Sequence, residues 1–192
     1  MSDFLFYLQL GWEHIISTDA LDHQLFIWAL VIVYTIKDFK SLLILVTAFT
    51  IGHSLTLVLS VLDVVRLSSA WVEFLIPCTI MLTALDNIIF KNQGGRRMWF
   101  NYLLALSFGF IHGMGFANTV RMMLAQEQSI GIPLLGFNIG LELGQLAAVA
   151  IIILIDVVMI KGLKIPRSWW VKATSLIVFL WAATMAWERL PF

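Results

Sequence analysis

Six long apolar stretches, separated by short polar connections, take up most of the chain. They cover roughly residues 17–36, 41–63, 69–90, 98–124, 131–160 and 168–187. A helix needs about 20 predominantly apolar residues to cross the hydrocarbon core of a bilayer, and each stretch is near or above that length. The pattern therefore predicts an all-α integral membrane protein, a polytopic bundle of about six transmembrane helices in one domain, 1–192.

Residues 4–16 are also apolar but too short to span a membrane. They contain Gly11, Glu13 and His14, so we expect a short N-terminal helix that is interfacial or re-entrant. Composition supports the membrane assignment, since 60% of the residues are apolar and only 12% are charged, about half the charged fraction of a soluble domain. The formal net charge of +0 argues against a nucleic-acid partner. The expected partner is the lipid bilayer, and the pattern is compatible with a monomer or a homo-oligomer.

Basic residues are unevenly distributed among the connections. Most follow the first, third and fifth stretches: Lys37, Lys40, Lys91, Arg96, Arg97, Lys161, Lys164 and Arg167. The other connections carry only Arg66 or Arg121. Because short cytoplasmic loops are enriched in Lys and Arg, this alternation predicts that both termini lie outside the cytoplasm.

Two histidines and three carboxylates crowd the segment from Glu13 to His23. Counting about 20 residues back from Lys37 places Asp19, Asp22 and His23 inside the membrane. An Asp at mid-helix costs about 2.5–3.5 kcal/mol on insertion scales, so an intramembrane Asp-His pair indicates a functional site. The alternative is helix capping by Ser17, Thr18 or Asp19; it does not account for Asp22 and His23, which lie beyond the cap.

Three further spans carry polar residues at positions that must be buried. His53 and Ser54 lie in the second span, and His112 lies among glycines in the fourth. In the fifth span, helical periodicity puts Asn138, Glu142 and Gln145 on one narrow stripe, opposite a face of glycines that we expect to pack against a neighbouring helix. Taken alone, His53 could equally be an interhelical hydrogen bonder.

Chain direction brings these groups to a common depth. His53, His112 and Glu142 each lie roughly 10–14 residues from a span end, and His23 lies in the outer part of the same membrane. We therefore predict one intramembrane site, leaning outward, where the four histidines converge. The candidate metal ligands are His14, Asp22, His23, His53, His112 and Glu142; the candidate supporting or access residues are Glu13, Asp19, Ser54, Asn138, Gln145 and Asp86.

Imidazole and carboxylate together suit a divalent transition metal such as nickel, cobalt or zinc. A line of acidic residues and His14, from Glu13 through Asp19 to Asp22, predicts that the ion enters from the outer side, between the 4–16 segment and the first span. Such an anionic funnel would raise the local concentration of a cation.

Motifs in four spans resemble those of the HupE/UreJ family of membrane proteins. The matching positions are His14, Asp22 and His23, Phe49 to His53, His112 to Gly115, and Phe137 to Glu142. The resemblance covers nearly the whole chain and implies a nickel or cobalt permease of the bacterial inner membrane. It also implies that the first-span His and Asp and the His-Gly motif handle the metal.

Two other functions are compatible with the same residues. An intramembrane zinc-dependent hydrolase acting on a lipid or membrane peptide would use three histidines as zinc ligands, with Glu142 or Asp22 as general base. Ser54 beside His53 offers a nucleophile, but the chain has neither a Gly-x-Ser-x-Gly nor a His-Glu-x-x-His pattern. The second alternative is a purely structural subunit. It gives no reason why the chain should carry Asp22 and Glu142, whose insertion into the membrane costs free energy.

Overall fold

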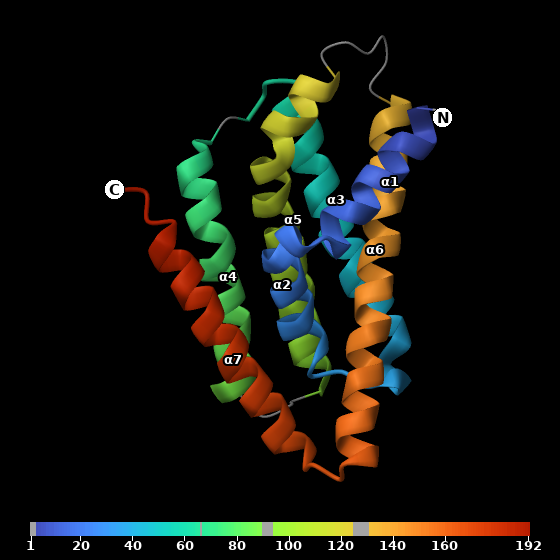
Figure 1. The fold of residues 1–192 in the computed structure, drawn as a ribbon, viewed down its shortest axis with the longest axis vertical. Coiled ribbons are helices and arrows are strands. Elements are labelled where there is room, and N and C mark those ends of the chain that lie inside the picture. Colours follow the sequence, from blue (N-terminus) through green and yellow to red (C-terminus); the bar gives the residue numbers. More distant parts are fainter. Residues whose placement is uncertain (1–2, 66, 90–93, 125–130) are drawn as a thin grey trace.

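The computed structural model describes residues 3–65, 67–89, 94–124 and 131–192, and within these ranges all side chains except those of 3, 61, 94–97 and 117–124. This part of the chain is all-helical, without strands (Figure 1). The helices are α1 (Asp3–Ile16), α2 (Leu21–Val31), α3 (Phe39–Val61), α4 (Ser69–Ile89), α5 (Gly94–Leu124), α6 (Gly131–Val157) and α7 (Arg167–Glu188). Short helical turns are η1 (Thr18–Ala20), η2 (Ile36–Asp38) and the π-turn η3 (Val158–Gly162).

Four helical segments within the described ranges are long and apolar enough to cross a membrane. They are Ile36–Ser60, Ser69–Ile89, Gly131–Gly162 and Arg167–Glu188, and they correspond to the second, third, fifth and sixth predicted spans. Helix α5 covers the fourth stretch, and the side chains at both of its ends lie outside the described residues. These segments make the chain an integral membrane protein, and many large apolar side chains on their outer faces are exposed, as lipid contact requires.

The prediction of one continuous helix over 17–36 is wrong. Helix α2 has 11 residues, so it rises only about 16 Å, roughly half of a hydrocarbon core of about 30 Å. Helix α1 has 14 residues and descends from one end of the bundle to its middle, where α2 begins and continues to the other end (Figure 1). The two helices thus follow one another along the bundle, interrupted at η1.

The interruption coincides with three polar residues, Ser17, Thr18 and Asp19. Ser17 adopts an extended conformation before η1 but makes no side-chain capping hydrogen bond. Capping by Ser17 therefore does not account for this polar segment. The side chain of Gln24, from the other side of the break, instead donates hydrogen bonds to the end of α1.

Glycine faces bring the half-helix α1 close to α6. A Cβ atom at Gly11 would overlap the backbone carbonyl of Phe137, and one at Gly140 would overlap that of Leu8. The glycine face predicted for the fifth span is therefore a packing face, and its partner is α1. The close approach fixes the depth of α1, and with it that of His14.

A second glycine contact joins α3 and α5. A Cβ atom at Gly109 would overlap the carbonyl of Phe49 and approach the backbone nitrogen of His53, while one at Gly52 would overlap the carbonyl of Leu106. Without side chains at these positions the two backbones come together. This contact sets the separation of the helices that carry His53 and His112.

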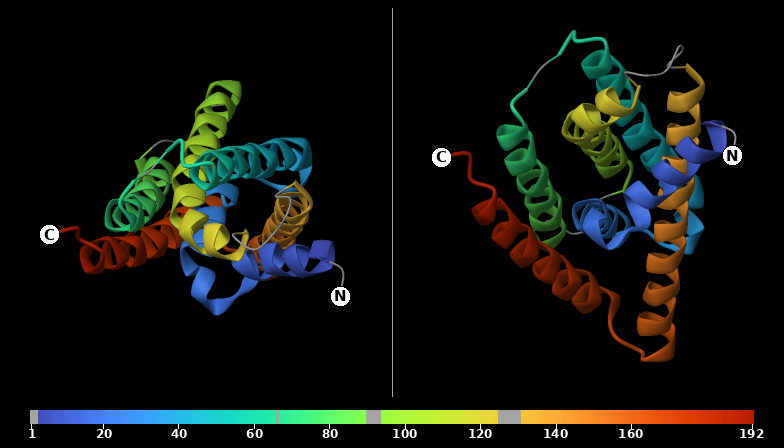
Figure 2. Two further views of the ribbon diagram at one scale, coloured as in Figure 1. Left: turned by 90° about the horizontal axis from the view of Figure 1, so that it is seen from above. Right: turned by 45° about the horizontal axis from the view of Figure 1, so that its top comes forward.

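Helix α2 lies inside the bundle, in contact with α4, α6 and α7 (Figure 2). Its Phe26 ring stacks on Phe108 of α5 at a centroid distance of 4.1 Å and on Phe49 of α3 at 5.4 Å. All three rings are 1% exposed. These aromatic contacts hold the start of α2 against the two helices that carry His53 and His112.

The opposite end of α2 is tied down by Arg167, at the start of α7. Its guanidinium donates to Asp156 of α6 at 2.9 Å and to the backbone carbonyls of Ile32 and Tyr34 at 3.2 and 2.6 Å. Figure 1 shows the α2–α3 and α6–α7 connections at this same end, together with the end of α4 and the start of α5. Lys37, Lys40, Lys161 and Lys164 therefore share one end; the side chains of Arg66, Lys91, Arg96, Arg97 and Arg121 lie outside the described residues.

Candidate metal site

The structure brings the four histidines together from four helices. His23 at the start of α2 is central: its ring centroid lies 4.6 Å from His14 of α1, 6.5 Å from His53 of α3 and 4.4 Å from His112 of α5. His14 and His53 are 5.7 Å apart. The break between α1 and α2 makes this possible, because it places the end of one half-helix beside the start of the other.

Two groups of side chains could each hold a metal ion, and they share His23. One consists of His14, His23 and His53, and the other of Asp22, His23 and His112. Within each group the potential ligand atoms lie within 4.8 Å of one another. Metal–nitrogen bonds of about 2.1 Å put two opposite ligands about 4.2 Å apart, so a small inward movement of the side chains would complete either group.

Five ring nitrogens of these histidines are buried and have no hydrogen-bond partner among the described residues. His23, His53 and His112 are 6%, 0% and 2% exposed. The Nε2 atoms of all four, and Nδ1 of His53, make no hydrogen bond within the described part of the chain. A buried polar atom left unpaired costs roughly 1–3 kcal/mol, so four such residues in one place call for a common ligand.

Hydrogen bonds at the other ring nitrogen direct Nε2 of two histidines into the cluster. Nδ1 of His23 lies 2.9 Å from Oδ1 of Asp22, which also accepts the His23 backbone N–H at 2.8 Å. Nδ1 of His112 lies 3.2 Å from the carbonyl of Phe108. When Nδ1 is the protonated nitrogen in each ring, Nε2 carries the lone pair, which is the usual arrangement for a metal-binding imidazole.

Gln24 supports the break in the helix and was not identified from the sequence. Its side-chain amide donates to the carbonyls of Ile15, Ile16 and Ser17 at 3.2, 3.3 and 2.8 Å. The carbonyls of Ile15 and Ile16 belong to the end of α1, where no intrahelical partner is available, and that of Ser17 also accepts the N–H of Ala20 at 3.1 Å. The sequence did contain a signal for this role, namely a polar residue directly after Asp22 and His23 within an apolar run.

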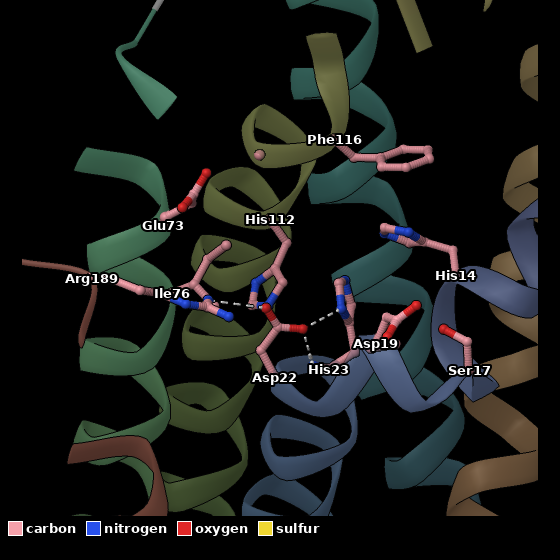
Figure 3. A pocket seen from close by; sticks show the side chains of 12 residues that line it. His14, Ser17, Asp19, Asp22, His23, Glu73, Ile76, His112, Phe116 and Arg189 are labelled. Carbon is pink, nitrogen blue, oxygen red and sulfur yellow. Dashed lines mark hydrogen bonds and ion pairs between the residues drawn. The ribbon is translucent and has the colours of Figure 1, made fainter. Parts of the chain in front are cut away.

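A cavity of about 260 Å³ opens beside the cluster (Figure 3). Its polar lining includes His14, His23, His112, Asp19, Asp22 and Glu73. Arg189, just after α7, also lines it and lies 3.4 Å from Oδ2 of Asp22. His53 does not line this cavity and lies deeper. Glu73 and Arg189 were not predicted from the sequence, because they are distant in the chain from the 13–23 segment.

The structure does not bring Glu142 into the histidine cluster. Its carboxylate accepts a hydrogen bond from Thr47 of α3 at 2.9 Å, and Gln145 likewise accepts from Thr50 at 2.9 Å. The polar stripe of α6 therefore faces α3, but at a level nearer the start of α3 than His53. Asn138, on the same helix, keeps Oδ1 buried and without a partner among the described residues.

The remaining candidates lie apart from the four histidines. Ser54 donates to the carbonyl of Thr50 in its own helix at 2.6 Å. Glu13 is exposed, accepts from Gln9 at 2.7 Å and does not line the cavity. Asp86, near the far end of α4, is half-buried and also outside the cavity lining. Of the predicted acidic access line, Asp19 and Asp22 border the cavity, and Glu73 takes the place expected for Glu13.

Comparison with known proteins gives one family match. A family model described as HupE / UreJ protein matches residues 1–189. No curated protein and no solved structure matches the chain.

Proposed function

The chain belongs to the HupE/UreJ family, and from this premise we propose that it transports a divalent transition metal ion, nickel or cobalt, through the histidine cluster. The family suggests metal ion transport in general. The metal is the transported substrate in this proposal, so the ligands must release it as well as bind it. We assign the contact with the ion to His14, Asp22, His23, His53 and His112.

The buried, unpaired Nε2 atoms of the four histidines carry the proposal. Imidazole nitrogen is a good ligand for nickel, cobalt and zinc, whereas calcium and magnesium prefer oxygen. Asp22 adds one negative charge beside the imidazoles, which favours a divalent cation at this depth. The residues present therefore fit a transition metal.

Transport requires more than one position for the ion, and the two overlapping ligand groups supply them. Asp22, His23 and His112 all border the cavity, as does His14 of the other group, and only His53 is set apart from it and fully buried. Because His23 belongs to both groups, it can remain bound while the ion exchanges Asp22 and His112 for His14 and His53. One ion would thus move inward without losing every ligand at once.

The break between α1 and α2 also supports transport. Transporters commonly place substrate sites where a membrane helix is broken, because the ends of the half-helices carry partial charges and free backbone groups. Here the carbonyl end of α1 meets the N–H end of α2 beside His14 and His23. Ligand positions at such a break can shift without disturbing a continuous helix.

We propose an orientation in a bacterial inner membrane with both termini outside the cytoplasm. The described basic residues Lys37, Lys40, Lys161 and Lys164 share one end of the bundle, which the positive-inside rule assigns to the cytoplasm. Glu73 lies one turn after the start of α4, near the opposite end. The cavity would then admit ions from outside.

The hydrolase alternative gains no support. Glu142 is hydrogen-bonded to Thr47, and Ser54 is hydrogen-bonded to its own helix backbone, so neither is in place to activate water or attack a substrate at the cluster. Asp22, the other candidate base, is paired with His23 and Arg189. No described contact joins Ser54 to a histidine ring that could serve as its base.

A flux measurement tests the proposed function. The purified protein should bind about one Ni²⁺ or Co²⁺ per chain, with weaker binding at acidic pH because protons compete for imidazole. Proteoliposomes containing the protein should take up these ions faster than protein-free liposomes, and Mg²⁺ should not compete. Failure to bind the ions, or flux equal to that of empty liposomes, would contradict the proposal.

The cavity lining predicts unequal roles for two acidic residues of the N-terminal segment. Both Asp19 and Glu13 are exposed, but only Asp19 lines the cavity. Asp19→Asn should reduce uptake several-fold at low external metal, where capture limits the rate, and the reduction should shrink at high salt. The matched control, Glu13→Gln, removes the same charge and should leave uptake unchanged. Equal uptake by the two variants at normal expression would rule out a role for the cavity charge in capture.

A further inference from the structure

Arg189 places a positive charge inside the cavity that should receive a cation. It follows the last residue of α7, and Figure 3 shows its side chain reaching toward Asp22. Nη1 lies 3.4 Å from Oδ2 of Asp22. The Arg189 side chain is 32% exposed, against 14% for that of Asp22, and both residues line the cavity together with three of the histidines.

The two oxygens of Asp22 have different partners. Oδ1 accepts both the backbone N–H and the ring of His23, which holds it in place. Oδ2 meets only Arg189 among the described contacts. Oδ2 is therefore the oxygen that a metal ion would take, and Arg189 already occupies its free side.

We propose that Arg189 is a tethered cation that neutralises Asp22 in the empty site and is displaced when a divalent ion binds. This inference rests on the proposed function. A monovalent cation would replace one positive charge with another and gain little for giving up the Arg189 contact. A divalent ion brings twice the charge and also binds the histidines. Arg189 thus selects against monovalent cations, and its return to Asp22 assists release of the metal.

The displaced guanidinium has an acceptor within the same cavity. Glu73 of α4 lines it too and is exposed. Beyond Arg189 the chain runs past α4, where the exposed Phe192 ring lies edge-on to Trp71 at a centroid distance of 5.9 Å. Arg189 therefore lies between Asp22 on one side and the α4 surface with Glu73 on the other. A change of its side-chain rotamer can move the guanidinium from the carboxylate of Asp22 to that of Glu73.

Affinity measurements on purified variants distinguish a tethered competitor from a structural support. Arg189→Gln should bind Ni²⁺ about tenfold more tightly than wild type, because the competing cation is gone, and should discriminate less against Na⁺. Arg189→Lys should stay close to wild type. In an Asp22→Asn background the Arg189→Gln change should have little further effect. Glu73→Gln should weaken Ni²⁺ binding several-fold, since displaced Arg189 loses its acceptor.

Chemical modification of the wild-type protein provides a second test that needs no variant. Phenylglyoxal reacts with accessible guanidinium groups, and Ni²⁺ should accelerate its reaction with Arg189 as measured by mass spectrometry. Arg167 is the matched control, because its bonds to Asp156 and two carbonyls lie at the far end of the bundle. Its reactivity should not change with Ni²⁺.

Each outcome has a distinct meaning. Weaker or unchanged Ni²⁺ binding by Arg189→Gln, or Ni²⁺ protection of Arg189 from phenylglyoxal, would overturn the role of Arg189 and leave the metal site intact. Absence of Ni²⁺ binding by the wild-type protein would overturn the proposed function, and the role of Arg189 with it.

Discussion

Replacing His23 with Gln should abolish high-affinity metal binding and uptake together. His23 is the one residue common to both potential ligand groups, so neither group keeps its donors without it. Loss of a residue that merely orients a ligand costs 10–100-fold in metal affinity, and loss of a shared ligand should cost more than about 100-fold. Calorimetric titration with Ni²⁺ and uptake into proteoliposomes would measure the two effects.

His53→Gln provides the informative comparison. It leaves Asp22, His23 and His112 in place, so the protein should still bind Ni²⁺ while uptake falls sharply. If His53→Gln loses binding as completely as His23→Gln, the histidines form a single site rather than two successive positions. If both variants bind normally, the cluster is not the metal site.

Gly109→Ala should have the second-largest effect, through the helix packing rather than the ligands. The added methyl group would overlap the backbone of α3 at Phe49 and His53 and force α3 and α5 apart. Overpacking of this kind costs about 1–3 kcal/mol, and here it would also separate His53 from His112. We expect a lower thermal unfolding temperature in detergent and weaker Ni²⁺ binding.

The control for this substitution lies on the same helix. A Cβ atom at Gly115 would make only ordinary contacts, at 3.4 Å from Val72 and 3.5 Å from Ile76, so Gly115→Ala should unfold at nearly the wild-type temperature. Similar unfolding temperatures for the two variants would show that close contact of α3 and α5 does not control stability.

The sequence was sufficient to predict the meeting of the four histidines, and the reason is geometric. Helical rise per residue is nearly constant, so residues at equal distances from the span ends lie at equal depth. Rotation of each helix about its axis is not fixed in this way. The shift of α6 along α3 is not fixed either: Glu142 was expected at the depth of His53, but its carboxylate accepts a hydrogen bond from Thr47, six residues nearer the start of α3.

The break between α1 and α2 shows what a count of consecutive apolar residues does not reveal. A length of about 20 apolar residues predicts a span whether or not the helix is continuous. The polar residues from Ser17 to Asp19 marked the position of the interruption. Because such residues also cap helices, they did not show whether a helix starts there or two half-helices meet there. The role of Gln24 depends on that break and so could not be assigned beforehand.

Long-range partners were the least accessible to sequence reasoning. Arg189 lies 167 residues beyond Asp22, and no local periodicity connects them. The insertion cost of Asp22 required some compensation, and the sequence placed His23 next to it; only the packing of α7 against α4 reveals the second partner.

The half-helices have a consequence for how the protein is made. Neither α1, with 14 residues, nor α2, with 11, reaches the length that lets a nascent segment insert stably by itself. The glycine face that packs against α1 belongs to α6, which emerges from the ribosome more than a hundred residues later. We therefore expect the N-terminal segment to dock late, after α6 has been inserted, so that His14 joins the other histidines only once nearly the whole chain has been synthesised.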